Sequence, residues 1–182
     1  MLLIFLLLFI GCSSINEVKT SDIVSVQQLV LTGKDIKQLG LSSGGACSLD
    51  ENYSNIIDSS AGQYSFCNYT INSINHTEIA VILQKFADYE ALNGSYQYDS
   101  LHLYSVEGII SENTFGDQSR FRVNNEHDYG GEFNPPGVYF YHLWIANDLF
   151  LIHITSGGSK EAKQYVTDIG GLILSKFDWH PI

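Results

Sequence analysis

The chain has 182 residues, of which 45% are hydrophobic and 16% are charged, and these values are typical of one folded domain with a substantial core. Twenty acidic residues against nine Lys and Arg give a formal net charge of −11 at pH 7. Sequence-independent binding to nucleic acid needs a basic surface that neutralises phosphates, so this charge argues strongly against nucleic acid as a partner.

The N-terminal residues 2–10 are all Leu, Ile or Phe. Such a run cannot cross the ~30 Å hydrocarbon core of a bilayer, which takes about 20 helical residues, but it fits the apolar region of a secretory signal. Its end, Phe9-Ile10-Gly11-Cys12, resembles the lipobox of prokaryotic lipoproteins, in which the cysteine receives lipid, palmitate included, and becomes the first mature residue. We therefore expect a lipoprotein signal peptide over residues 1–12 with Cys12 as the lipid attachment site. The alternatives are a simple signal peptide cut near Ser14 and a retained N-terminal strand.

Residues 13–22 are mostly polar and contain no aromatic residue, which is typical of a flexible tether. The remainder, residues 23–182, is expected to form a single α+β domain. With the lipid anchor in place, this domain would stand at the cell membrane and face away from the cytoplasm.

Two further cysteines, Cys47 and Cys67, form an even pair of the kind that an oxidising compartment converts to a disulfide. A bridge between them would close a loop of about 20 residues and contribute roughly 3 kcal/mol of stability. A metal-binding pair and two free thiols are the alternatives, although no C-x-x-C spacing favours zinc. We predict the disulfide.

Asn-x-Ser/Thr sequons occur four times, and they matter only in a compartment that contains the glycosyl transferase. An archaeal surface glycoprotein would satisfy both the lipobox and the sequons. The candidate glycosylation sites are Asn52, Asn68, Asn75 and Asn93.

Hydrophobic periodicity and turn residues predict the elements of the domain in chain order. The expected elements are a strand over 23–31, a short helix over 35–39 capped near Thr32, a polar loop over 41–60, strands over 64–70 and 78–86, a helix over 96–106, a strand over 119–123 and a loop over 124–136. Residues 101–110 fit a helix and a strand equally well.

The clearest β signal is a hairpin of residues 138–145 and 149–155, rich in Tyr, Phe, Trp and Ile. A turn centred on Asn147 and Asp148 would place His142 directly opposite His153, close enough to share a metal ion or a ligand beside Trp144. The alternative is a neutral histidine pair under a covering element. Both faces of the hairpin are largely apolar, so we expect the sheet to be covered on both sides.

A closing helix is predicted from Ser159, its expected N-cap, to Phe177, because apolar residues recur there at three- and four-residue steps. Gly170 and Gly171 lie inside this helix at a cost of up to about 1 kcal/mol each relative to Ala. Close approach of the helix backbone to the sheet would explain both glycines.

Three short motifs extend these predictions to a family. They are the opening Leu31-Thr32-Gly33-Lys34-Asp35-Ile36, the strand from Ile79 to Phe86, and the element Gly116-Asp117-Gln118-Ser119. With the hairpin and the closing helix, their order resembles small secreted prokaryotic lipoproteins, mostly archaeal, PsbP/Mog1-like lipoproteins and PknH-like extracellular sensor domains. The resemblance implies an α+β sandwich, in which helices flank a mostly antiparallel sheet, and it implies no catalytic residue and no cofactor.

Signatures of catalysis are sparse in the sequence, which has no Gly-x-Ser-x-Gly elbow and no P-loop. We therefore expect a non-enzymatic binding, sensor-like or accessory module whose partner is the membrane, through the lipid, and an unidentified protein or small molecule. The alternative is a surface hydrolase or metal-dependent enzyme that uses His and carboxylates. A pocket joining His142 or His153 to a carboxylate would favour the enzyme, and a shallow aromatic surface would favour binding.

Overall fold

The computed structural model describes residues 23–53, 61–102, 108–124 and 136–177. Within these ranges, eight strands form one sheet in which every pairing is antiparallel, accompanied by three α-helices and one 3-10 helix. The predicted α+β fold is confirmed. The elements are η1 Val26–Leu29, α1 Gly33–Gln38, β1 Leu41–Ser43, β2 Ser48–Asp50, β3 Ala61–Ile71, β4 Glu78–Phe86, α2 Tyr89–Leu101, β5 Ile109–Glu112, β6 Gln118–Asn124, β7 Tyr139–Asn147, β8 Phe150–Gly158 and α3 Ala162–Ser175.

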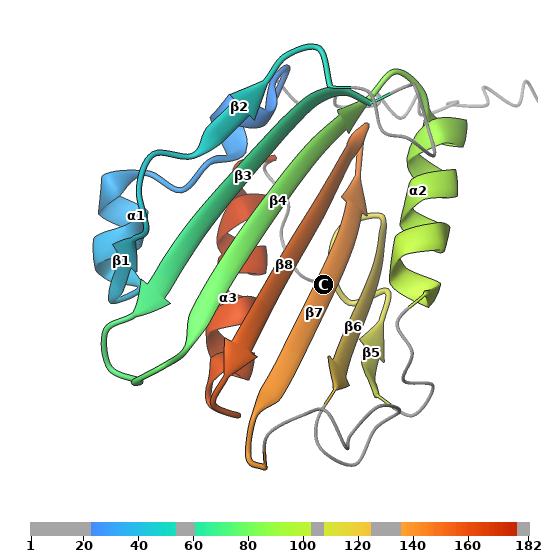
Figure 1. Ribbon diagram of the computed structural model, residues 1–182. Helices are drawn as coiled ribbons and strands as arrows, with labels where there is room; N and C mark the ends of the chain where they lie inside the picture. Colours follow the sequence, from blue (N-terminus) through green and yellow to red (C-terminus); the bar gives the residue numbers. More distant parts are fainter. Residues whose placement is uncertain (1–22, 54–60, 103–107, 125–135, 178–182) are drawn as a thin grey trace, which may run out of the picture.

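The strand order is β1-β3-β4-β8-β7-β6-β5, and β2 pairs with β3 on the same edge as β1. Helix α3 lies behind the sheet in Figure 1, whereas α2 stands at the right against the opposite face. The main core lies between α3 and the sheet, and a smaller one lies under α2. Among the described residues, no helix combines the length and apolar composition that a membrane crossing needs.

The strand predicted over 23–31 is wrong, because its centre is the 3-10 helix η1. Val26 and Leu29 are both fully buried, and a three-residue spacing places them on the same side of a 3-10 turn. The side-chain oxygen of Gln28 accepts hydrogen bonds from the backbone N–H groups of Val24 and Ser25, at 2.8 and 2.9 Å, and closes the turn. The apolar residues of this segment correctly predicted that it is buried, but their spacing belongs to a 3-10 helix and not to a strand.

The predicted short helix after Thr32 is confirmed as α1, which starts two residues earlier than expected. The Thr32 hydroxyl accepts from the Asp35 N–H at 3.3 Å, and the Asp35 carboxylate accepts from the Thr32 N–H at 2.8 Å. This reciprocal capping box stabilises a helix that is too short to persist alone.

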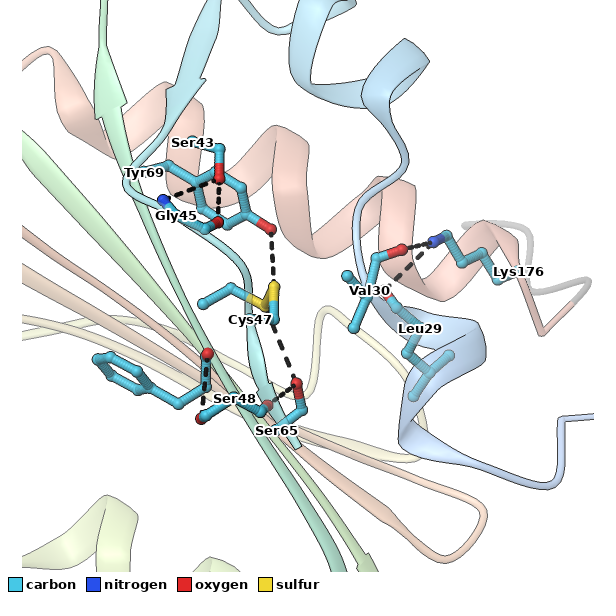
Figure 2. The surroundings of a disulfide bond; sticks show 11 residues. Leu29, Val30, Ser43, Gly45, Cys47, Ser48, Ser65, Tyr69 and Lys176 are labelled. Carbon is cyan, nitrogen blue, oxygen red and sulfur yellow. Dashed lines mark hydrogen bonds between the residues drawn. A yellow bond between two sulfur atoms is a disulfide. The ribbon is translucent and has the colours of Figure 1, made fainter. Parts of the chain in front are cut away.

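The polar loop predicted over 41–60 contains two short strands, β1 and β2, within the described residues 41–53. Every residue of β2 is exposed, so these strands lack the apolar alternation that reveals a strand in sequence. They are held instead by pairing with β3 and by the predicted disulfide between Cys47 and Cys67, which the structure confirms with Cα atoms 4.5 Å apart. Figure 2 shows the Tyr69 hydroxyl beside the Cys47 sulfur, at 3.9 Å.

The middle of the chain is partly as predicted. Strands β3, β4 and β6 confirm the three expected strands. Helix α2 begins seven residues before the predicted start at Tyr96, because the Asp88 carboxylate accepts from the Ala91 N–H at 2.9 Å and caps the helix there. The predicted end of that helix falls in residues 103–107, and most of the loop predicted over 124–136 falls in 125–135; both segments lie outside the described residues.

Helix α3 confirms the closing helix, but its N-cap is Glu161 rather than the predicted Ser159. The Ser159 carbonyl accepts from the Ala162 N–H at 3.1 Å, so an additional turn precedes the helix. Gly170 fits the predicted close approach, since a Cβ there would lie 2.9 Å from Leu143 Cδ2. Gly171 does not, because a Cβ there would meet nothing within 4 Å.

Candidate functional site

The sheet face opposite α3, here called the open face, carries the histidines that the sequence singled out. Helix α2 covers only one end of it, where Leu92 and Tyr96 pack on Trp144, Ala146 and Leu151. Farther along the strands, the side chains of this face are partly exposed and include aromatic and apolar groups. These partly exposed side chains are Phe66, Ala80, Ile82, Val138, Phe140, His142, His153 and Thr155.

The predicted register of the hairpin is wrong by two positions. Trp144 lies opposite His153, and His142 lies opposite Thr155. The two-residue turn is Asp148 and Leu149, because Asp148 adopts the left-handed conformation, with φ of 50°, that such a turn requires. A shift of two positions leaves every side chain on its predicted face.

Three rings therefore meet on the open face, and the structure does bring the two histidines together. The ring centroids of Trp144 and His153 are 4.5 Å apart, those of His142 and Trp144 are 5.4 Å apart, and those of the two histidines are 5.5 Å apart. His142 Nδ1 lies 3.3 Å from His153 Nε2. His142 and His153 are diagonal neighbours on adjacent strands rather than directly opposite each other. Because strands twist, the side chains of such a diagonal pair can still come into contact.

Both imidazoles are neutral at neutral pH. Burial, and then the nearby Arg122 guanidinium, lower the pKa of His142 to about 4. Burial, and then His142 itself, lower the pKa of His153 to about 3. A neutral pair at this distance shares one N–H···N hydrogen bond, with one ring as donor and the other as acceptor.

The nitrogens of the pair are spaced as two ligands of a tetrahedral ion would be, since metal–nitrogen distances of about 2.0–2.1 Å give a separation of roughly 3.3 Å. The positive charge of Arg122, which repels a proton from His142, would repel a metal cation in the same way. Among the described residues, no three of His, Cys, Asp and Glu lie close enough together to hold a metal ion. The neutral pair therefore explains the geometry better than a metal site.

A polar cluster of Ser100, Glu112, Arg120 and Arg122 flanks the rings on the β5–β6 side. Arg120 Nε donates to the Glu112 carboxylate at 2.8 Å, and its guanidinium lies 5.5 Å from the centre of the Tyr96 ring. Arg122, 4% exposed, donates to the Ser100 carbonyl at 3.0 Å. These contacts fasten the C-terminal part of α2 to β6, so the cluster positions the helix that packs on Trp144.

An open groove of about 530 Å³ occupies the end of the open face that α2 leaves uncovered. Two rows of residues across the strands define it. One row runs from Asn68 through Ala80 to Thr155, and the next runs from Glu78 through Gly157 to Phe140. The small side chains in the middle of each row form the floor, and Asn68, Glu78 and Phe140 form the rim.

Gly157 allows the Phe140 ring to lie on the sheet, because an added Cβ would come within 3.1 Å of that ring. The groove is continuous with the ring cluster, since Thr155 lines the groove and is the strand partner of His142. It thus combines an aromatic wall, a small floor and several polar groups, which is the usual chemistry of a small-molecule site.

Sequence reasoning did not identify Glu78, Ala80 or Gly157 as site residues. Ala80 and Thr155 are small residues at outward positions of predicted strands, and that pattern was visible, whereas Gly157 lies two residues beyond the predicted end of its strand. These small residues form one groove floor only because β4 and β8 are neighbours in the sheet, and the strand predictions did not specify that pairing.

The other predicted site residues are placed as follows. The four sequon asparagines are all exposed, so each could accept a glycan, and Asn68 lies at the groove. Cys12 and the tether over residues 13–22 lie outside the described residues.

A second groove, of about 770 Å³, lies on the other side of the molecule among α1, α3 and the turn between β5 and β6. Gly171 lines it, together with Leu39, Phe115 and Asp168. This accounts for the open space beside Gly171.

Comparisons with known proteins add nothing to this geometry: no protein-family model matches the chain, and no curated protein matches it significantly.

Proposed function

We propose that this chain is a membrane-anchored, extracytoplasmic module that binds a small ligand in the groove of its open face. The main support is the state of three polar side chains there. Asn68, Glu78 and Thr155 form no side-chain hydrogen bond or ion pair with any other described residue, although each lines the groove. Their hydrogen-bonding capacity is available to a ligand.

The location is proposed from the N-terminal motif and the disulfide. The apolar run ending at Cys12 has the form of a lipoprotein signal, and the bond between Cys47 and Cys67 fits an oxidising compartment. The sensor-like character is proposed from the order of sequence motifs that resembles PsbP/Mog1-like and PknH-like domains.

The arrangement of the groove supports binding rather than hydrolysis. Glu78 lies on β4 and His142 on β7, so two strand spacings separate them across the sheet. Along the strands, His142 lies two residues beyond Phe140, which is level with Glu78. Neighbouring strands are about 4.8 Å apart, so the two backbones stand roughly 12 Å apart. No hydrogen bond among the described residues joins this carboxylate to the imidazole. Between them lie Gly157, Thr155 and the Phe140 ring, none of which is an acid or a base.

Ligand screening by NMR tests the proposal. A library of small molecules is titrated into the ¹⁵N-labelled full chain in detergent micelles, and amide shifts are mapped onto the sheet. We expect binders to shift residues 78–80, 138–140 and 155–158. Phe140→Ala should weaken these shifts, whereas Tyr89→Ala, which removes an exposed ring from α2, should leave them unchanged. Binders that perturb only other surfaces, or a complete lack of binders, would contradict the proposal.

A further inference from the structure

The charge of the groove indicates which ligand it takes. Of the residues that line it, Glu78 is the one carboxylate, His76 is the one histidine, and none is Lys or Arg. The Glu78 side chain is exposed, and no described cation lies within ion-pair distance of it. A carboxylate accepts hydrogen bonds and donates none, so its best partner is a cationic N–H donor.

The opposite rim favours the same kind of ligand. Glu78 and Phe140 flank Gly157 from either side, and Gly157 has no side chain to separate them. Two strand spacings of about 4.8 Å place these residues roughly 10 Å apart at the backbone. A cation held by the carboxylate can therefore direct its apolar part, or a second charge, to the face of the Phe140 ring.

Size and donor set distinguish an organic cation from a metal ion. The groove of about 530 Å³ is far larger than a hydrated ion needs and lies within the range of small-molecule sites. Phe140 and Ala80 offer apolar surface that a hard divalent ion cannot use, and Glu78 is the single carboxylate among the lining residues. Thr155 and Asn68 provide neutral oxygens that can accept hydrogen bonds from the N–H groups of an ammonium that Glu78 does not bind.

We infer that the groove binds a protonated organic amine, with the ammonium group on Glu78 and the apolar part against Phe140. This inference rests on the proposed binding function and specifies its ligand class. The strongly acidic chain, with its net charge of −11, would also raise the local concentration of such cations.

Three probes that share a ring and differ in charge test the inference: benzylamine, benzyl alcohol and benzoate. Each is titrated into the full chain in micelles and its affinity is measured from amide shifts at residues 78–80 and 155–158. We expect benzylamine to bind more tightly than benzyl alcohol, benzoate to bind most weakly, and added salt to weaken benzylamine alone.

Matched variants separate the local carboxylate from the general charge. Glu78→Gln should weaken benzylamine about threefold to fivefold, the range of an exposed ion pair, and leave benzyl alcohol unchanged. Glu90→Gln makes the same charge change at an exposed position of α2, away from the groove. Because solvent and salt screen a distant charge, this variant should bind benzylamine and benzyl alcohol as the wild type does. Phe140→Leu keeps apolar bulk but removes the ring face that the phenyl group of both probes would contact, so it should weaken benzylamine and benzyl alcohol alike.

The outcomes distinguish the two proposals. If benzyl alcohol or benzoate binds as tightly as benzylamine, or if Glu78→Gln behaves like Glu90→Gln, the amine inference is wrong and the binding function stands. If none of the three probes binds at the groove and the library also yields no binder there, both are wrong. Circular dichroism of each variant confirms that the exposed substitutions leave the fold intact.

Discussion

Trp144 lies directly opposite His153 across the β7–β8 hairpin, and the two rings stack at an interplanar angle of 12°. The indole covers the imidazole on one side while His142 contacts its ring nitrogen. Burial is the main cause of the low pKa of both histidines, followed by Arg122 for His142 and by His142 for His153. The pair is thus a source of pH dependence.

We expect the free energy of unfolding to decrease as the pH falls from 7 to 5. Histidines in the unfolded chain take up protons near pH 6.5, whereas folded His142 and His153 stay neutral until about pH 4 and 3. The unfolded state then binds more protons, so stability decreases by up to about 1.4 kcal/mol per pH unit for each histidine.

Urea unfolding at pH 7, 6 and 5 measures this slope. The double variant His142→Gln/His153→Gln should flatten it, because both depressed pKa values are then removed. A wild-type slope that survives in the double variant would show that other groups are responsible.

Removing the disulfide should destabilise the protein by about 3 kcal/mol, because Cys47 and Cys67 are 20 residues apart and their bond restricts the unfolded chain. The bond also holds β1 and β2 at the edge of β3. Denaturation of Cys47→Ala/Cys67→Ala against the wild type tests the magnitude. Non-reducing mass spectrometry should recover the two peptides linked, and alkylation of both thiols in freshly isolated protein would contradict the bond.

Gly170 and Gly171 provide a matched pair of substitutions with opposite expected signs. Gly170→Ala should destabilise the protein by about 1–3 kcal/mol, because its Cβ would lie 2.9 Å from Leu143 Cδ2 in a fully buried layer. Gly171→Ala meets open space and should stabilise the helix by about 0.5–1 kcal/mol. Thermal unfolding of both variants is the measurement, and equal effects would mean that α3 does not approach the sheet as described.

Cys12→Ser tests the proposed anchor. Without the thiol no lipid can be attached, and each buried CH₂ of a lipid chain contributes about 0.8 kcal/mol of membrane affinity. We expect the variant to appear in the medium or to remain unprocessed. Cell fractionation with Cys67→Ser as a control separates loss of the lipid from loss of the disulfide. A Cys12→Ser protein that is processed normally and stays on the membrane would contradict the lipoprotein proposal.

The sequence was most informative where one period dominated. The alternating aromatic residues of β7 and β8 predicted both strands and the faces of their side chains, and the apolar steps of α3 predicted that helix. The burial of Val26 and Leu29 was equally visible, but a three-residue spacing inside an apolar run does not distinguish a strand from a 3-10 turn. The hydrogen bonds of Gln28 decide that point, and they depend on side-chain geometry.

The site was harder to predict than the fold because it is made by contacts between strands. The observed register differs from the predicted one by two positions because Asp148, at the first position of the turn, adopts the left-handed conformation. The Asp117 carboxylate stabilises this turn from a distant part of the chain, since it accepts a hydrogen bond from the Asp148 N–H at 2.9 Å. Glu78 and Phe140 line the same groove only because β8 lies between β4 and β7 in the sheet. Pairings of this kind have no signature in a single sequence.

Asn68 is at once a sequon and a rim residue of the groove, so glycosylation would act on ligand access as well as on solubility. An oligosaccharide on that side chain would stand over the floor formed by Ala80 and Thr155. Under the proposed binding function, molecules with and without the sugar would be two glycoforms that differ in ligand access. The occupancy of this one acceptor site would then set the fraction of the protein that is able to bind, with no change in the amount of protein.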